Sequence, residues 1–168
     1  MKVIKILTIT LLIKIAIGKF PKEFTIDEIG GTAGIRIHGN EKRSDRSGSS
    51  VSYAGDLNHD GLGDFAIATN EALPGRRTRI TVVFGTKNVS SWGSNVSIND
   101  FILPPKGFAF DGYRRIVHTP TLSFAGDING DSLDDFLIGM PEYDGDFGNV
   151  FIVLGKQGNL SDVSPISL

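Results

Sequence analysis

A nine-residue acidic motif occurs twice in this chain of 168 residues, each time in the same sequence context. Residues 52–68 read SYAGDLNHDGLGDFAIA, and residues 123–139 read SFAGDINGDSLDDFLIG. Corresponding aspartates lie 127 − 56 = 71 residues apart. A second match, ITVVFG at 80–85 with VFIVLG at 150–155, has an offset of 155 − 85 = 70. Self-similarity at a fixed period is typical of repeat architectures, so we expect two copies of one structural unit.

The similarity extends upstream and sets the boundaries of the two copies. GIRIHG at 34–39 resembles GFAFDG at 107–112. We therefore assign residues 24–87 to the first unit and residues 101–156 to the second. A polar spacer rich in Ser and Asn, 88–100, joins them, and 157–168 form a C-terminal tail. Trp92 in the spacer is expected to be a packing residue.

The N-terminal segment differs from the rest of the chain. Lys2 and Lys5 precede an apolar run that Lys14 interrupts, and Ala16 and Gly18 are small residues spaced as at a signal-peptidase site. This pattern predicts a secretory signal over residues 1–18 that is removed from the mature protein. The alternatives are a buried strand and an uncleaved anchor. No later segment is apolar enough to span a bilayer, so we expect no transmembrane segment in the mature chain.

Short apolar runs predict strands throughout both units. Residues 51–53 and 122–124 alternate as half-buried strands do, and 65–68 and 136–138 are brief apolar runs after the acidic loops. The β-branched and aromatic runs 80–84 and 151–154 end at glycine. We predict an all-β fold of two four-stranded blades of a β-propeller, forming an incomplete ring. A small two-sheet sandwich is the alternative.

Composition excludes several classes of function. The 17 Lys and Arg against 19 Asp and Glu give no basic field for phosphate backbones, so nucleic acid is not expected as a partner. Cysteine is absent, which excludes disulfide scaffolds, Cys-ligated metals and thiol catalysis.

The two acidic loops are candidate calcium sites because they place oxygen side chains at positions 1, 3, 5 and 9 and a backbone carbonyl at position 7. Such an all-oxygen set suits a hard cation, and carboxylates this close repel one another unless a cation compensates. A metal-free Asx turn is the alternative. The first loop offers Asp56, Asn58, Asp60, Leu62 and Asp64, and the second offers Asp127, Asn129, Asp131, Leu133 and Asp135.

Two comparisons sharpen this interpretation. An EF-hand needs a bidentate Glu at position 12, where these loops have Ile67 and Ile138 in expected strands, so the EF-hand is excluded. The second loop has Ser132 where the first has Gly61, and it adds the charge of Asp134. A serine in a left-handed conformation costs about 1 kcal/mol relative to glycine, so the second site is expected to be weaker or slightly reshaped.

The order Gly-Asp-x-Asn-x-Asp-Gly-x-x-Asp-Phe, a short strand and a later Phe84-Gly85 resembles the FG-GAP repeat of integrin α-subunit propellers and their bacterial relatives. The second copy has Leu154-Gly155, and the Gly-Ala-Pro element is degraded in both copies. The resemblance covers residues 24–156. It implies that Ca²⁺ braces each blade through the ten residues named above. Such propellers usually have seven blades, so the resemblance also implies that this is a truncated gene product, that copies associate, or that another protein completes the ring.

We therefore expect a secreted or cell-surface, non-catalytic, calcium-binding module for adhesion or protein interaction. The alternative is an accessory propeller fragment of a secreted or surface enzyme such as a phospholipase. Catalysis by the acidic loops themselves is disfavoured, because catalytic metal sites keep an open coordination position beside a base. Three N-x-S acceptor sequons indicate possible glycosylation, at Asn88, Asn95 and Asn159.

Overall fold

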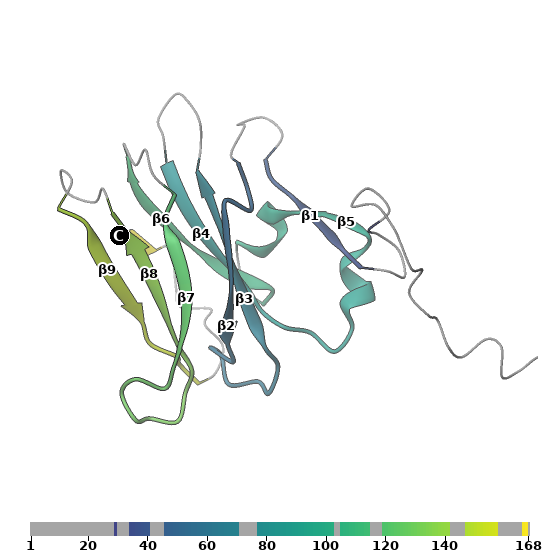
Figure 1. The fold of residues 1–168 in the computed structure, drawn as a ribbon. Helices are drawn as coiled ribbons and strands as arrows, with labels where there is room; N and C mark the ends of the chain where they lie inside the picture. Colours follow the sequence, from purple (N-terminus) through teal and green to yellow (C-terminus); the bar gives the residue numbers. More distant parts are fainter. Residues whose placement is uncertain are drawn as a thin grey trace, which may run out of the picture.

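The computed structural model describes residues 29, 34–40, 46–70, 77–102, 105–114, 119–141, 147–157 and 166–167. The expected signal segment, residues 1–18, lies outside these residues, as do Asn159 and most of the tail. The described chain is built from strands and two short 3₁₀ helices, so the predicted all-β fold is confirmed (Figure 1). The elements are β1 (Arg36–His38), β2 (Ser50–Gly55), β3 (Asp64–Asn70), β4 (Arg77–Val83), η2 (Val89–Trp92), β5 (Asn95–Ser97), η3 (Ile98–Phe101), β6 (Gly107–Arg114), β7 (Thr121–Gly126), β8 (Asp135–Met140), β9 (Asn149–Val153) and β10 (Ile166–Ser167).

The largest sheet contains most of the first unit. Its strand order is β10-β6-β4-β3-β2, and β2, β3, β4 and β6 form an antiparallel meander. A bulge interrupts the β2–β3 ladder, because Tyr53 pairs with Phe65 whereas Gly55 pairs with Asp64. The bulge lies immediately before the acidic loop, so it sets the direction in which the loop leaves the sheet.

The second sheet repeats this arrangement with β7, β8 and β9. The order is β7-β8-β9, all antiparallel, and the same bulge occurs between Phe124 and Gly126. Matching bulges at matching sequence positions show that the sequence repeat is also a repeat of backbone geometry.

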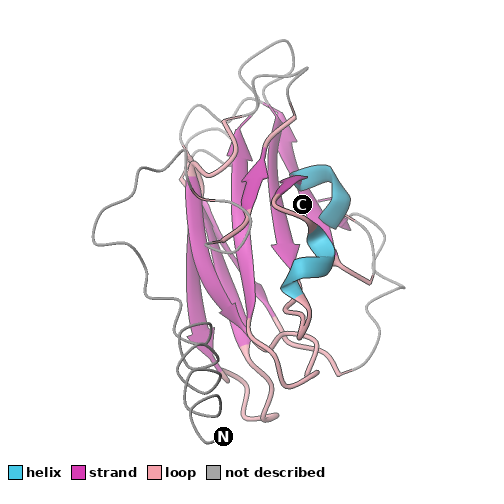
Figure 2. Cartoon of the chain, turned by 90° about the vertical axis from the view of Figure 1, so that its right-hand side faces the viewer, coloured by secondary structure: helices cyan, strands magenta, loops and turns pink. Residues whose placement is uncertain are grey.

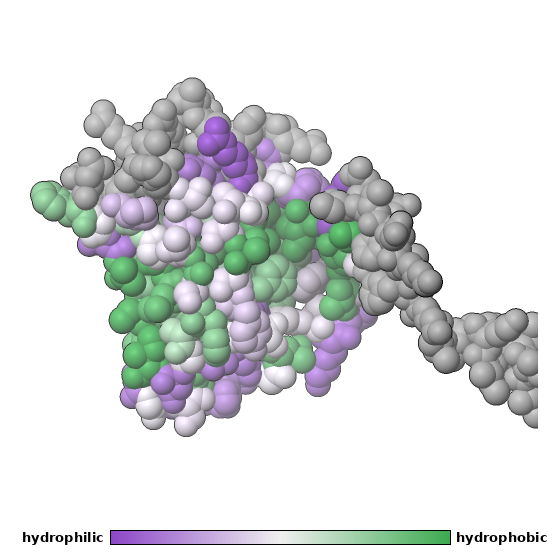
Figure 3. All heavy atoms as spheres, viewed as in Figure 1, coloured by the Kyte–Doolittle hydropathy of each residue, from purple (hydrophilic) through white to green (hydrophobic). Residues whose placement is uncertain are grey.

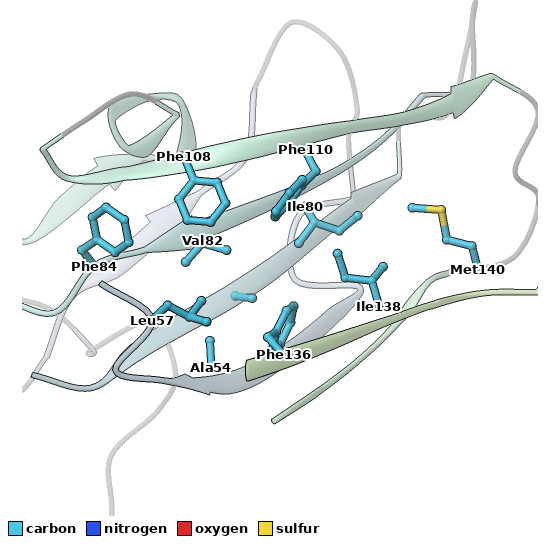
Figure 4. Packing of buried hydrophobic residues seen from close by; sticks show 11 residues of the cluster. Ala54, Leu57, Ile80, Val82, Phe84, Phe108, Phe110, Phe136, Ile138 and Met140 are labelled. Atoms are coloured by element: carbon cyan, nitrogen blue, oxygen red, sulfur yellow. The ribbon is translucent and has the colours of Figure 1, made fainter. Parts of the chain in front are cut away.

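The main core lies between these two sheets (Figures 1 and 2). In Figure 4, Ile80, Val82 and Phe110 of the larger sheet point toward Phe136 and Ile138 of the smaller one. All five side chains are buried. Burial of apolar surface between the sheets is therefore the main interaction that joins the two units.

A second, smaller core covers the opposite face of the larger sheet. The spacer forms η2, β5 and η3, and β5 pairs in parallel with β1 (Figure 1). Val96 of the spacer and Phe101, the first residue of the second unit, are buried against Ile67 and Val83. Trp92 packs edge-on against Phe101 with ring centroids 5.0 Å apart, which confirms its expected packing role. The spacer is thus a structural layer and more than a connection.

The sheets do not follow the boundaries of the sequence repeat. β6, from the start of the second sequence copy, pairs with β4 of the first, and Arg79 of β4 forms an ion pair with Asp111 of β6. β1, the corresponding segment of the first copy, pairs with β5 instead. Each unit was expected to contain four strands of its own copy, whereas β7–β8–β9 is three-stranded in the described residues. The pairing puts Phe108 and Phe110 beside Val82 and Ile80, where both are buried.

Candidate metal centre

The two acidic loops connect the first two strands of each meander. The first joins β2 to β3 and the second joins β7 to β8, and both lie at the same end of the sheets, at the bottom of Figure 1. Each begins at an aspartate directly after the bulge and ends at an aspartate that starts the next strand. Ile67 and Ile138, at position 12, lie within β3 and β8, which confirms the exclusion of an EF-hand.

In the first loop, side-chain oxygens turn inward onto the loop backbone. The Asp60 N–H donates to both Asp56 Oδ1 at 2.9 Å and Asn58 Oδ1 at 3.1 Å. Gly61 N–H donates to Asp56 Oδ2, and Leu62 N–H donates to Asp60 Oδ1, both at 2.8 Å. Asn58 Nδ2 donates to Asp60 Oδ2 at 3.0 Å. The side chains at positions 1, 3 and 5 are therefore brought together within one turn.

The second loop reproduces these hydrogen bonds. Asp131 N–H donates to Asp127 Oδ1 and Asn129 Oδ1, each at 3.1 Å. Ser132 N–H donates to Asp127 Oδ2, Leu133 N–H donates to Asp131 Oδ1, and Asn129 Nδ2 donates to Asp131 Oδ2. One bond is added, from Gly130 N–H to Asp127 Oδ1 at 2.7 Å. Because the two loops differ in sequence at four positions, this agreement follows from the shared oxygen-bearing residues.

The aspartates at position 9 connect each loop to a distant glycine. Asp64 is buried and accepts hydrogen bonds from Leu57 N–H at 3.0 Å and Gly85 N–H at 2.8 Å. A side chain at Gly85 would collide with the carbonyl oxygen of Gly63, so this close approach requires glycine. The Phe-Gly signature thus has a structural reason, because its glycine holds the last aspartate of the acidic loop.

The second copy has the same connection. Asp135 is buried and accepts from Ile128 N–H at 2.8 Å and from Gly155 N–H at 2.9 Å. A side chain at Gly155 would meet the carbonyl oxygen of Asp134. The sequence pattern predicts Asp64 and Asp135 only as metal ligands and does not predict these hydrogen bonds. The spacing from each aspartate to its glycine, 85 − 64 = 21 and 155 − 135 = 20, was the available signal.

The turn at position 6 has a left-handed backbone in both loops. Gly61 has φ of +83° and Ser132 has φ of +70°. The expected left-handed conformation of Ser132 is confirmed, and it is one of three non-glycine residues with positive φ in the described part of the chain.

Acidic groups in the first loop affect one another. Burial raises the pKa of the Asp64 carboxyl from its usual 3.8 to about 6, and the neighbouring Asp60 and Asp56 carboxylates add to this rise. The hydrogen bonds from Gly85 and Leu57 oppose it by stabilising the ionised form. The loop therefore concentrates negative charge that a bound cation would compensate.

The donor chemistry of both loops fits a hard cation. Every side-chain donor at positions 1, 3, 5 and 9 is a carboxylate or amide oxygen, and each carboxylate oxygen can accept more than one interaction. In the described residues, no group of three or more His, Cys, Asp or Glu side chains is arranged to hold a metal ion. A calcium site here would therefore also draw on the amides of Asn58 and Asn129 and the carbonyls of Leu62 and Leu133. The roles of the ten residues as ligands stay a prediction.

Contacts between the two units also involve residues of the acidic loops. Asp56 N–H donates to Asp134 Oδ2 at 2.8 Å, and Lys156 N–H donates to the Leu57 carbonyl at 3.0 Å. From the sequence, Asp134 is expected only to add charge to the second loop. Its role depends on the packing of one unit on the other, for which the local sequence carries no signal.

Comparison with known proteins gives no matching family model and no matching curated protein, so the FG-GAP resemblance rests on the sequence motifs alone. Among the described residues, no helix has the length and apolar character that a membrane crossing requires.

Proposed function

We propose that this chain is an extracellular, non-catalytic FG-GAP-like module in which Ca²⁺ braces two packed β-propeller blades. The observation that carries the proposal is the duplicated loop geometry, in which Asp, Asn and Asp at positions 1, 3 and 5 converge through corresponding hydrogen bonds after matching bulges. The antiparallel meander β2–β3–β4–β6 has the strand number and order of one blade. The smaller sheet corresponds to the first three strands of the next.

The role of the metal is structural in this proposal. The aspartate at position 9 of each loop accepts a hydrogen bond from a glycine of the same unit. The first loop also donates a hydrogen bond, from Asp56 N–H, to Asp134 of the second unit. Bound Ca²⁺ would neutralise the loop carboxylates and fix the end of each sheet. The loops and sheet faces would then be available for adhesion or protein contact, as in other repeat scaffolds.

Calcium titration by calorimetry tests the metal assignment. We expect two sites with dissociation constants of roughly 10⁻⁴–10⁻³ M, the range of extracellular modules, and a melting temperature that rises with calcium. The double variant Asp60→Ala with Asp131→Ala should lose binding at both sites.

Asp134→Asn provides the matched control for this titration. It removes a carboxylate of the second loop that is not a predicted ligand, but keeps an oxygen that can accept from Asp56 N–H. Calcium binding should therefore persist in this variant. An absence of binding heat with the wild-type chain, or equal binding in the double variant, would contradict the calcium assignment. Capture of extracellular proteins on the immobilised chain tests the adhesive role directly.

A further inference from the structure

The outer face of the second unit exposes side chains whose counterparts in the first unit are buried. Ile80, Val82 and Phe84 are 0%, 0% and 5% exposed, because the second unit covers them. Their counterparts at an offset of 150 − 80 = 70, Val150, Ile152 and Leu154, are 69%, 56% and 53% exposed. In Figure 3, hydrophobic residues gather on the side where β9 lies in Figure 1.

The same contrast occurs at the acidic loops. Leu57 is 2% exposed, whereas its counterpart Ile128, at 128 − 57 = 71, is 50% exposed. The segment 54–57 is held by the second unit through Asp134, Phe136 and the Lys156 N–H. The corresponding segment of the second unit, 125–128, has no such neighbour in the described part of the chain.

The first unit has an open groove built from the counterparts of those holding residues. Gly63, Phe65 and Thr86 correspond to Asp134, Phe136 and Lys156 at the same offsets. They line a groove of about 570 Å³ together with apolar side chains that include Val89 and Trp92. The chain therefore has an exposed segment at one end and, at the other, a groove of the kind that holds this segment internally.

We propose that a second copy of this chain docks head to tail, placing its segment 125–128 in the groove lined by Phe65 and Val89. The interface is heterologous, since it uses different surfaces on the two copies, and it yields a ring or an open chain of copies. At segment 125–128 it repeats the internal contact of segment 54–57, whereas Ile67, the counterpart of Ile138, is already buried with Val96 and Phe101 and takes no part. The contact at the segment itself differs in one respect. Gly63 stands where Asp134 stands internally, so the carboxylate that would accept from Asp127 N–H is missing. Association is therefore weaker than the internal contact.

This inference rests on the proposed role as an interaction module but not on calcium binding. Sedimentation velocity of the purified chain, over a roughly hundredfold concentration range, should show average masses that rise to multiples of the chain mass. A wild-type chain that stays monomeric over this range overturns the proposal and leaves the exposed face to another protein.

Two variants with exposed substitutions test the two sides of the interface. Ile128→Asp charges the inserted segment, and Val89→Arg blocks the groove; both side chains are exposed in one copy, so the fold is retained. Each should weaken association by at least about tenfold, because a charge would be buried without a partner. Phe147→Asp is the control for an exposed charge, since Phe147 is exposed and belongs neither to segment 125–128 nor to the groove lining, and it should associate like wild type. Association that persists in Val89→Arg overturns the head-to-tail arrangement.

Mixing the two variants gives the decisive measurement. Ile128→Asp keeps a functional groove and Val89→Arg keeps a functional segment, so the mixture should form a one-to-one heterodimer that does not grow further. A mixture that stays monomeric, or an interface that only Ile128→Asp disrupts, overturns the proposal. Parallel runs with calcium and with a chelator separate the two ideas. If a monomeric chain binds calcium, the docking proposal is wrong and the calcium assignment stands. If the chain associates without binding calcium, the calcium assignment is wrong and the docking proposal stands.

Discussion

Ser132 is one of two positions at which the acidic loops differ in backbone cost; at the other, His59 with φ of +58° stands opposite Gly130 with φ of +79°. The Ser132 φ of +70° matches the +83° of Gly61, yet a serine carries a Cβ that this conformation disfavours. The Ser132 N–H still donates to Asp127 at 2.8 Å, as the Gly61 N–H does to Asp56. The hydrogen bonds of the loop thus hold Ser132 in a left-handed backbone conformation that is unfavourable for serine by itself.

The substitution Ser132→Gly should therefore stabilise the chain. We expect the free energy of unfolding to rise by up to about 1 kcal/mol, because glycine adopts the left-handed conformation without the cost that serine has. The greater freedom of glycine in the unfolded chain offsets part of this gain. Gly61→Ser is the reciprocal variant and should lower it by a similar amount. Urea denaturation of the three chains measures both changes, and equal midpoints would show that neither position is strained.

At the scale of elements, the bulge and its acidic loop also position contacts between sheets. The bulge ends at Gly55, and the next residue, Asp56, donates its N–H to Asp134 of the other loop. Tyr53 and Phe124, on β2 and β7, have ring centroids 5.2 Å apart. Neighbouring strands of the two units therefore meet through one polar and one aromatic contact close to the loops.

Removing the Asp134 carboxylate should weaken the contact between the sheets. Asp134→Ala leaves the partly buried Asp56 N–H without its acceptor, which should cost about 1 kcal/mol of unfolding free energy. Asp134→Asn keeps an acceptor oxygen and should recover most of this loss. Thermal unfolding of both variants in a chelator gives the comparison. Two variants that both melt like wild type would show that the bond contributes nothing.

For the whole molecule, stability depends on the packing of one sheet against the other. The main core takes Ile80 and Val82 from the larger sheet and Phe136, Ile138 and Met140 from the smaller one, and all are fully buried. The outer face of β9 makes no corresponding contribution within a single copy, since Ile152 is exposed. In a single copy, the smaller sheet is therefore stabilised by apolar burial only on the face that packs against the larger sheet.

A matched pair of substitutions separates these two faces. Ile138→Ala leaves a cavity between the sheets and should cost about 2–5 kcal/mol. Ile152→Ala removes the same atoms from an exposed position and should cost less than about 0.5 kcal/mol in dilute solution. Denaturant titration at low protein concentration measures both, and similar costs would contradict the two-layer core.

Local pattern was sufficient to locate most strands of the fold. The runs at 51–53, 65–68 and 136–138 lie within strands because side-chain alternation is written directly in the sequence. The order of residues also identified the paired loops and excluded an EF-hand. These are properties of neighbouring residues, so one sequence is enough to find them.

Partners across the fold could not be predicted in this way. Similarity between 34–39 and 107–112 gave no indication that one segment would pair with β5 and the other with β4, since pairing depends on which edge is free. The hydrogen bond from Gly85 to Asp64 and the contact of Asp134 with Asp56 likewise join residues from different elements. Each depends on how the sheets are assembled.

The placement of β6 has a consequence for how such a protein can grow. The strand that opens the second sequence copy, β6, pairs with β4 in the sheet of the first copy. The two copies therefore share one sheet. If the sequence unit were duplicated again, the first strand of each new copy would pair with the sheet of the copy before it. Conversely, dividing the chain at the sequence boundary, between residues 87 and 101, would remove the inner strand β6 from the first sheet. Each of the two fragments would then lack part of a sheet that both of them build.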